Sequence, residues 1–335
     1  MSRLRISFAC WPYDRVGALR HGEVTPEGID LNFIPSHPGD TFLRMLDHRE
    51  FEASEMSMSS YLMSRELDDP FVAIPVFTSR TFRHNGLFVN TQSDIREPRD
   101  LVGKRVGLPE YQITAALWIR GILQHEYGVH PTTVTWLAER WGTGMRSHGS
   151  ATGFKPPPGV SIQTIPQGES QFSLLVKGEI EAAFVIQDIP SGICRSSLRD
   201  FTGPVPSVRR LFEDYKKVEM DYYRRTGLFP VMHTVVLRRD VYEKNRWAAL
   251  SLYRALCDAK EEFYKNIGEW ELFSFPWIRH ALEEQRALLG GDPYPYGLRA
   301  NRKVVDTICQ YSFEQGLTKT RAEPESLFAP GTLET

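Results

Sequence analysis

One segment constrains the fold of this chain more than any other: residues 100–121, DLVGKRVGLPEYQITAALWIRG. Gly103 marks a turn, residues 105–108 have the pattern of a short strand that Pro109 ends, and the residues from Thr114 onwards have the apolar spacing of a long helix. In open α/β sheets, ligands bind beyond the carboxyl ends of strands, where helix N-termini offer unpaired N–H groups and partial positive charge. The segment therefore predicts an α/β protein with a ligand site at residues 109–114.

The same alternation of strands and helices continues along the chain. Strands are expected at 4–9, 29–34, near 53, 71–76, 86–90, 104–108, 134–137, 161–165, 182–186 and 233–238. Helices are expected at 41–46, after 57–60 as far as 67, and at 114–127, 169–177, 215–225, 247–267, 278–289 and 302–315. This order predicts βαβ units with mostly parallel sheets.

Two lobes account for the order of the predicted elements. Lobe I is expected to combine residues 1–90 with 235–335, including the C-terminal helices, and lobe II to consist of 91–234. The chain would cross between them near 88–91 and near 234–237. Residues 138–159 are rich in Gly, Ser and Pro, which predicts a long loop, and loops of that length are usually functional or mobile.

Composition and motifs exclude several function classes. A net charge of −2 over 335 residues gives no basic field for nucleic acid, and no stretch approaches the roughly 20 apolar residues of a membrane span. The four cysteines form no CxxC pair and the first residues lack a secretion-signal pattern, so reduced thiols and a cytoplasmic location are expected. The nine histidines form no HxH or HExxH motif, so no metal site is expected, and P-loop, GxGxxG and GxSxG patterns are missing.

Three places share a strand end that feeds a helix N-terminus: residues 55–60, 109–114 and 168–170. Their serines and threonines, among them Ser57, Ser59 and Thr114, are either helix caps, worth about 1 kcal/mol each, or ligands for an anion. A cap is the simpler interpretation at any one of these places. Three such places facing one cleft would instead favour a bound anion.

Charged residues near the predicted crossings add candidates for binding and proton transfer. Arg80 and Arg83 lie in SRTFRHNG with His84, and two arginines suit a dicarboxylate, although a solvated loop or structural ion pairs would explain them as well. His233 begins a predicted strand, where it is either a core residue or a proton carrier. Glu110 is a poor neighbour for a captured anion and is therefore a candidate acid.

Six longer segments carry a family resemblance. They are ACWPYDR (9–15), EMSMSSYL (55–62), AIPVFTSRTFRHNGLFVN (73–90), GKRVGLPEYQITAALWIRGIL (103–123), DYYRRTGLFPVMHTVVLRRDVYE (221–243) and PYPYGLRANRKVVDT (293–307). Through them the chain resembles the 4,5-dihydroxyphthalate decarboxylase family over most of its length. The resemblance implies a two-lobed periplasmic-binding-protein type II-like fold, with mixed, mostly parallel sheets and a cleft between the lobes. Residues 139–157 and 187–200 depart from the family pattern, which leaves the exact substrate open.

The resemblance also implies a reaction, the loss of carbon dioxide from the aromatic dicarboxylate 4,5-dihydroxyphthalate to give protocatechuate. Each ring hydroxyl is para to a carboxylate and serves as the electron sink, so no cofactor is expected. The proposed carboxylate ligands are Arg80 and Arg83, helped by Ser57, Ser59 and Thr114. The acid–base candidates are Glu110, His84 and His233, and the residues expected to close the cleft are Tyr13, Arg15, Tyr111 and Gln112.

Alternatives stay open from the sequence. One is a solute-binding protein for an aromatic acid, although that class usually carries a secretion leader. Another is a different cytoplasmic enzyme of the same fold, such as a menaquinone-pathway dehydratase or a pyrimidine-precursor synthase. A third is a decarboxylase for a related aromatic acid. A homo-oligomer is compatible with all of them.

Overall fold

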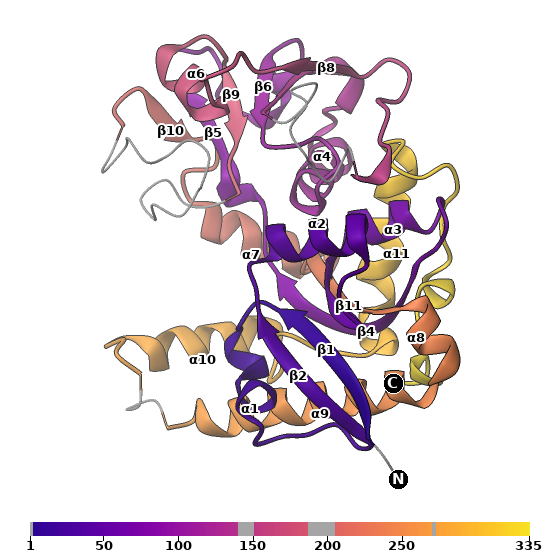
Figure 1. The fold of residues 1–335 in the computed structure, drawn as a ribbon. Helices are drawn as coiled ribbons and strands as arrows, with labels where there is room; N and C mark the ends of the chain where they lie inside the picture. Colours follow the sequence, from indigo (N-terminus) through magenta and orange to yellow (C-terminus); the bar gives the residue numbers. More distant parts are fainter. Residues whose placement is uncertain (1–2, 140–150, 187–204, 270–272) are drawn as a thin grey trace. The chain divides into compact units, whose positions relative to one another are not determined.

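The computed structural model describes residues 3–139, 151–186, 205–269 and 273–335 (Figure 1). The chain forms two compact units. Unit 1 consists of Met1–Arg80, Val231–Cys309 and Ala322–Thr335, and unit 2 of Thr81–Pro230 and Gln310–Arg321. The predicted lobes differ from these two units, because the prediction placed residues 81–90 and the whole C-terminal part of the chain in lobe I. The structure groups strand β5 (Leu87–Asn90) with unit 2, because β5 pairs with two strands of that unit.

Unit 1 is built on a mixed five-stranded sheet with the order β2-β1-β3-β11-β4. Its strands are β1 (Leu4–Cys10), β2 (Ile29–Pro35), β3 (Ala53–Ser57), β4 (Phe71–Arg80) and β11 (Val231–Arg238). β1 runs parallel to β2 and β3, whereas β11 runs antiparallel to both β3 and β4. The sheet therefore joins two parts of the chain that are about 150 residues apart in sequence, since β11 inserts between β3 and β4.

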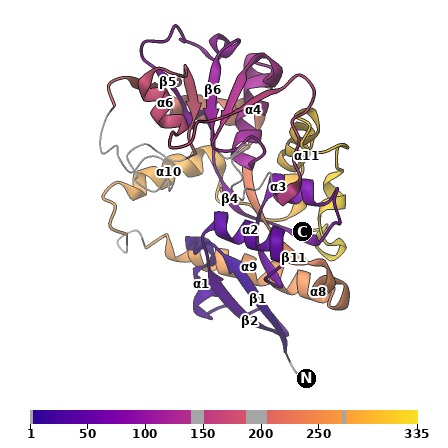
Figure 2. The ribbon, with the colours of Figure 1, turned by 45° about the horizontal axis from the view of Figure 1, so that its top comes forward.

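Helices from before β4 and after β11 belong to unit 1. They are α1 (Gly17–His21), α2 (Pro38–His48), α3 (Met58–Ser64), α8 (Arg239–Lys244), α9 (Trp247–Asn266), α10 (Ile278–Leu289) and the first part of α11 (Leu298–Glu314). Leu252, Leu256 and Ala259 of α9 share one core with Ile6 and Phe8 of β1. The long helix thus lies against the sheet (Figure 2) and fixes the strands whose ends carry the polar residues described below.

Unit 2 has a six-stranded sheet in the order β10-β5-β9-β6-β7-β8. The strands besides β5 are β6 (Arg105–Leu108), β7 (Thr135–Ala138), β8 (Ser161–Thr164), β9 (Ala182–Phe184) and β10 (Val208–Arg210). Its helices include α4 (Thr114–Tyr127), α6 (Gln171–Lys177) and α7 (Tyr215–Thr226). The pairs from β9 through β6 and β7 to β8 are parallel, and the pairs that β5 makes with β9 and β10 are antiparallel.

The segment 100–121 folds as predicted. Gly103 has a φ of +77°, which favours glycine, β6 spans Arg105–Leu108, and α4 begins at Thr114. Gly121 of α4 faces the Tyr311 ring so closely that an added Cβ would lie 2.0 Å from a ring carbon. Glycine at 121 is therefore required for α4 to pack against the 310–321 part of unit 2.

Most of the other predicted elements are also confirmed, with bounds that shift by a few residues. The α/β class is confirmed, and both sheets are mixed. α1, α8 and β10 were not predicted. The divergent region 187–200 and most of the predicted loop 139–157 lie outside the described residues. Among the described residues, the helices are all too short or too polar to cross a membrane.

Candidate functional site

A fully buried carboxylate, that of Glu55 near the end of β3, receives several hydrogen bonds within unit 1. The Tyr13 hydroxyl donates to Oε1 at 2.6 Å, and the Thr78 hydroxyl donates to the same oxygen at 3.0 Å. The backbone N–H of Trp11 donates to Oε2 at 3.1 Å. These donors come from β4 and from the loop after β1. Together with β3, which carries Glu55, three segments of the chain meet at this charge.

His233 of β11 completes this cluster. Its Nδ1 lies 2.6 Å from Glu55 Oε1 and 3.3 Å from the Tyr13 hydroxyl. The imidazole is 19% exposed, whereas the Glu55 side chain is 0% exposed. Within the described part of the chain, Nε2 of His233 forms no hydrogen bond. The ring is therefore held through one nitrogen and can exchange a proton through the other.

The backbone of β11 is irregular at this histidine. His233 is opposite Ser57 of β3 on one side and Ser79 of β4 on the other, and the register with β4 shifts both before and after it. Such irregularities re-aim a side chain and are frequent beside active sites. In a regular strand, the alternation of side chains between the two faces of the sheet would alone set the direction of the His233 side chain.

The environment of Glu55 keeps its carboxylate ionised. Burial raises the pKa of Glu55. The charge of His233 and the hydrogen bonds from His233, Tyr13 and Trp11 together lower the pKa by more than burial raises it, so the net shift is downwards. Burial and the charge of Glu55 raise the pKa of the Tyr13 hydroxyl and of the Cys10 thiol well above their usual values. One fixed negative charge thus stands among neutral donors beside the imidazole of His233.

The two predicted serines lie at the start of α3, next to this cluster. Ser57 is the N-cap residue, yet its side chain makes no capping bond, and its hydroxyl instead lies 3.2 Å from the Ser59 hydroxyl. Both serines are buried. The N-terminus of α3 is thus without a side-chain cap, on the strand that also carries Glu55.

Two predicted arginines of unit 1 are engaged by protein groups. Arg15 donates to Asp14 at 2.7 Å and to the carbonyl of Thr78 at 2.9 Å, and it stacks on the Tyr294 ring at 3.9 Å. Arg80 donates through Nη2 to the carbonyl of Pro295 at 3.1 Å and to the side chain of Asn301. These contacts tie β4 and the N-terminal loop to the segment 292–301.

In unit 2, the predicted residues after β6 are all buried. Gln112 Nε2 donates to the carboxylate of Glu110. The Tyr111 ring stacks on the Phe154 ring, with the two centroids 5.5 Å apart. The Tyr111 ring also contacts Arg120, whose guanidinium lies 3.5 Å from the ring centroid. Thr114 is the first residue of α4, whose N-cap, Ile113, provides no side-chain bond.

The other two predicted residues of unit 2, Arg83 and His84, lie at the 3-10 turn before β5. The His84 ring packs against Tyr127, Phe212 and Tyr222, and neither ring nitrogen has a hydrogen-bond partner among the described residues. Burial, with help from the charge of Arg225, lowers the pKa of His84 to about 4. At neutral pH this imidazole is therefore uncharged.

Arg83 has a charged neighbour in the same unit. Burial lowers the pKa of Arg83 to about 10, and the charge of Glu219 opposes that shift. Burial raises the pKa of Glu219 to about 7, although Arg83 and a 3.0 Å bond from the backbone N–H of Asn85 favour the carboxylate. The pair is consistent with the alternative that these arginines are structural.

The third predicted helix start is a cap. The Ser170 hydroxyl accepts the Ser173 backbone N–H at 3.0 Å, and the Ser173 hydroxyl accepts the backbone N–H of Ser170 at 2.8 Å. The simpler interpretation is confirmed here, whereas α3 and α4 start without side-chain caps.

Sequence reasoning did not single out Glu55 or Thr78. The signal was an acidic residue inside a short strand, ASEMS, in which every residue is buried. An acid in such a strand must be paired or hydrogen-bonded, because an unpaired buried charge is strongly unfavourable. Among the described residues, His, Cys, Asp and Glu side chains form no group of three or more that could hold a metal ion.

Comparisons with known proteins agree with this architecture. The family described as NMT1/THI5 like matches residues 21–140. The periplasmic aliphatic sulphonate binding protein SsuA from Escherichia coli has a similar structure, with a TM-score of 0.51 and 14% identity over 98% of this chain and 92% of that protein. A putative periplasmic sulfonate-binding protein from Methylobacillus flagellatus KT gives a TM-score of 0.50 with the same identity and coverage. At such identities the likeness shows the periplasmic-binding-protein-like fold alone.

Two relatives are much closer in sequence. The 4,5-dihydroxyphthalate decarboxylase of Comamonas testosteroni is 34% identical over 100% of this chain and 99% of its own length. A protein of the same name from Pseudomonas putida is 33% identical over 67% of this chain and 83% of its own length. The chain belongs to the 4,5-dihydroxyphthalate decarboxylase family.

Proposed function

We propose that this protein is a carboxy-lyase that converts 4,5-dihydroxyphthalate into protocatechuate and carbon dioxide. The observation that carries the proposal is the Glu55–His233 pair, in which a buried, ionised carboxylate orients a partly exposed imidazole. The whole-length match to a relative named as this decarboxylase supplies the substrate. That match favours the decarboxylase over a solute-binding protein or a dehydratase of the same fold.

The chemistry requires one proton to reach a ring carbon. Removal of a proton from a ring hydroxyl makes the para carbon, which bears a carboxylate, electron-rich. A general acid then protonates that carbon, and the ring becomes a dienone. The carbon–carbon bond to the carboxylate breaks, its electron pair restores the aromatic ring, and carbon dioxide leaves.

His233 is the group that we assign to the proton transfer at the ring carbon. Its Nδ1 is bound to Glu55, so in the imidazolium form the ring has a fixed orientation and donates the proton on Nε2, while Glu55 stabilises the positive charge. Glu55 acts through His233 and is a positioning residue. Tyr13 donates to the same oxygen of Glu55 that contacts His233, which limits rotation of the carboxylate.

The second carboxylate of the substrate needs a separate ligand. In unit 1, the hydroxyls of Ser57 and Ser59 lie at the start of α3, where the N-cap side chain makes no capping bond. Uncapped N–H groups and the partial positive charge of a helix N-terminus favour a carboxylate. The predicted roles of Glu110, Tyr111, Gln112, Thr114, Arg80, Arg83 and His84 stay predictions.

A comparison of three substrates tests the proposal. Purified protein is incubated with 4,5-dihydroxyphthalate, 4-hydroxyphthalate and phthalate, and carbon dioxide and the aromatic products are measured. The first should give protocatechuate, the second only 3-hydroxybenzoate, and the third nothing, because phthalate has no para hydroxyl to accept the electrons. In deuterium oxide, the product should carry deuterium at the carbon that lost its carboxylate. Turnover of phthalate at a similar rate would refute the para-hydroxyl mechanism, and binding of 4,5-dihydroxyphthalate without turnover would refute the decarboxylase.

We also propose a cytoplasmic location. Cys10 and Cys257 are free thiols in the structure, which suits a reducing compartment. Fractionation of the native host with an antibody against the protein tests this, and recovery from the periplasmic fraction would contradict it.

A further inference from the structure

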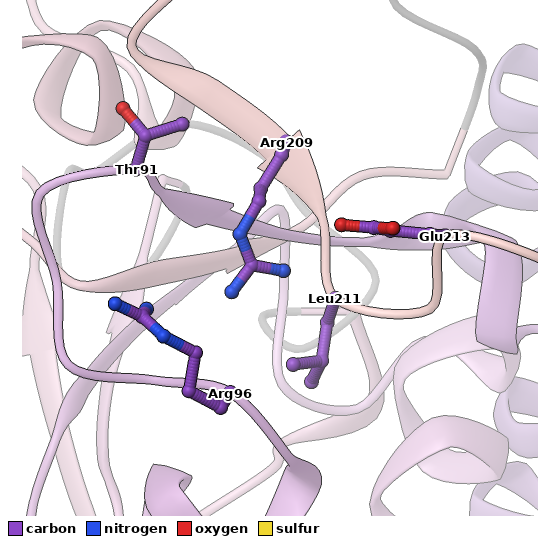
Figure 3. A pocket seen from close by; sticks show the side chains of 5 residues that line it. All are labelled: Thr91, Arg96, Arg209, Leu211 and Glu213. Carbon is purple, nitrogen blue, oxygen red and sulfur yellow. The ribbon is translucent and has the colours of Figure 1, made fainter.

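Unit 2 contains a pocket that shares no lining residue with the Glu55–His233 cluster. Thr91, Arg96, Arg209, Leu211 and Glu213 line it, and its volume is about 580 Å³. Thr91 follows β5, Arg209 belongs to β10 and Arg96 lies in the loop after β5 (Figure 3). The pocket therefore sits along the antiparallel β5–β10 pair at one edge of the six-stranded sheet.

One backbone carbonyl holds both arginines of this pocket. Arg96 Nη1 donates to the oxygen of Ile95 at 3.0 Å, and Arg209 Nη2 donates to the same oxygen at 2.6 Å. Further carbonyls fix each group, Ser93 for Arg96 at 2.9 Å and Arg210 for Arg209 at 3.0 Å. Two guanidinium groups are thus held next to each other, and Figure 3 shows both turned towards the same space.

No carboxylate forms an ion pair with either arginine within the residues that the structure describes. Of the acidic residues close to Arg96 in sequence, Asp94 pairs with Lys104, and Asp100 accepts the backbone N–H groups of Arg96 and Glu97 at 2.7 and 2.9 Å. Like charges at a shared acceptor repel each other, and an anion between them would remove that repulsion. Paired guanidinium groups also match the oxygens of a carboxylate.

The other residues that line the pocket indicate which chemical class of ligand fits it. Leu211 gives an apolar wall, and the Glu213 carboxylate, which forms no ion pair among the described residues, gives an acceptor at a different point of the pocket (Figure 3). An inorganic dianion would use only the arginines and would be repelled by Glu213. A ring with a carboxylate at one end and a hydroxyl at the other would use all of them.

We propose that this pocket binds a small aromatic hydroxycarboxylate. Its carboxylate lies between Arg96 and Arg209, its ring lies on Leu211 and its hydroxyl donates to Glu213. The site is a second one, distinct from the Glu55–His233 cluster, and its occupancy does not depend on the decarboxylation proposed above.

Calorimetric titration tests the site with three probes, 4-hydroxybenzoate, benzoate and inorganic phosphate. Arg96→Gln and Arg209→Gln should each weaken the binding of 4-hydroxybenzoate at one site by about tenfold or more, since each removes a charge-assisted contact. Arg99→Gln is the matched control, because Arg99 is an exposed neighbour that does not line the pocket, and it should change affinity less than twofold. Glu213→Gln should weaken 4-hydroxybenzoate more than benzoate.

The same variants separate this site from the catalytic one. Turnover of 4,5-dihydroxyphthalate by Arg96→Gln at low substrate should stay within about twofold of wild type, and thermal unfolding confirms that each variant is folded. Unchanged affinity for 4-hydroxybenzoate in both arginine variants would overturn the proposal. Tighter binding of phosphate than of 4-hydroxybenzoate at the affected site would replace the aromatic ligand by an inorganic anion and overturn it as well.

Discussion

His233 in unit 1 and His84 in unit 2 are the same residue type in opposite environments. His233 has a carboxylate on one nitrogen and partial exposure, whereas His84 is fully buried among aromatic rings with no hydrogen-bond partner among the described residues. The first arrangement suits the proton transfer that we propose for His233. The second keeps the ring neutral, because burial lowers its pKa to about 4. The contrast shows that a carboxylate partner together with partial exposure suits a histidine to acid–base chemistry, whereas full burial without a partner keeps the ring neutral.

The largest test of this contrast is to remove each imidazole. His233→Gln should lower kcat for 4,5-dihydroxyphthalate by about 100-fold to 10,000-fold, the range for loss of a general acid. His84→Phe, which keeps an aromatic ring in the cage, should change kcat less than about threefold. Steady-state kinetics on both variants, with circular dichroism to show that they are folded, gives the result. Equal losses in the two variants would abolish the distinction.

Removing the charge behind His233 should have a smaller effect. Glu55→Gln is expected to lower kcat by about tenfold to 100-fold with little change in KM, as is typical when the group that orients a functional histidine is lost. It should also shift the pH profile of kcat, which a purely structural loss would not do. A variant with the wild-type pH profile and rate would show that Glu55 only stabilises the fold.

The pH dependence of the free energy of unfolding should show that His84 is uncharged in the folded protein. Its folded pKa of about 4 lies below the usual 6.5, so the unfolded chain binds more protons between these values and stability is lost as the pH falls. Wild type should therefore lose about 2 kcal/mol more unfolding free energy between pH 7 and pH 5 than His84→Phe does. Glu219 has the opposite sign, since its raised pKa favours the folded state at lower pH, but it is present in both proteins. Urea titrations at the two pH values measure the difference, and equal pH dependence would show that His84 is solvated.

The smallest effect is expected for Tyr13→Phe. This change removes one donor to Glu55 and leaves those from Thr78 and Trp11, so kcat should fall less than about tenfold. The stability should fall by about 1 kcal/mol, the usual net value of a hydrogen bond. A loss of activity as large as that of His233→Gln would instead give Tyr13 a direct part in proton transfer.

Local patterns predicted much of the fold. Gly103, Pro109 and the apolar spacing after Thr114 located β6 and α4, because turn residues and helical periodicity act over short distances. β10 was missed because two of its three residues, Arg209 and Arg210, are charged, whereas the equally short β9 is entirely apolar. The boundary between the units differs from the predicted one because β5 pairs with β9 and β10. Such pairing depends on partners far away in the chain, which local patterns do not show.

The site was predictable only in part, for the same reason. His233 was a candidate because it begins an apolar strand, but its partner Glu55 is 178 residues away, and nothing in either local sequence joins them. Arg80 and Arg83 illustrate the converse. They are three residues apart and were expected to act together, yet Arg80 bonds within unit 1 and Arg83 belongs to unit 2.

The irregular register around His233 has a consequence for comparing relatives of this protein. In a strand, the loss or gain of one residue turns every later side chain to the other face of the sheet. The spacing between Val231 and Val235 therefore matters as much as the presence of a histidine. A relative that keeps the histidine but differs in length by one residue there would point its imidazole away from the acid on β3. Alignments that slide a gap through this stretch would conceal the loss of the Glu55–His233 contact.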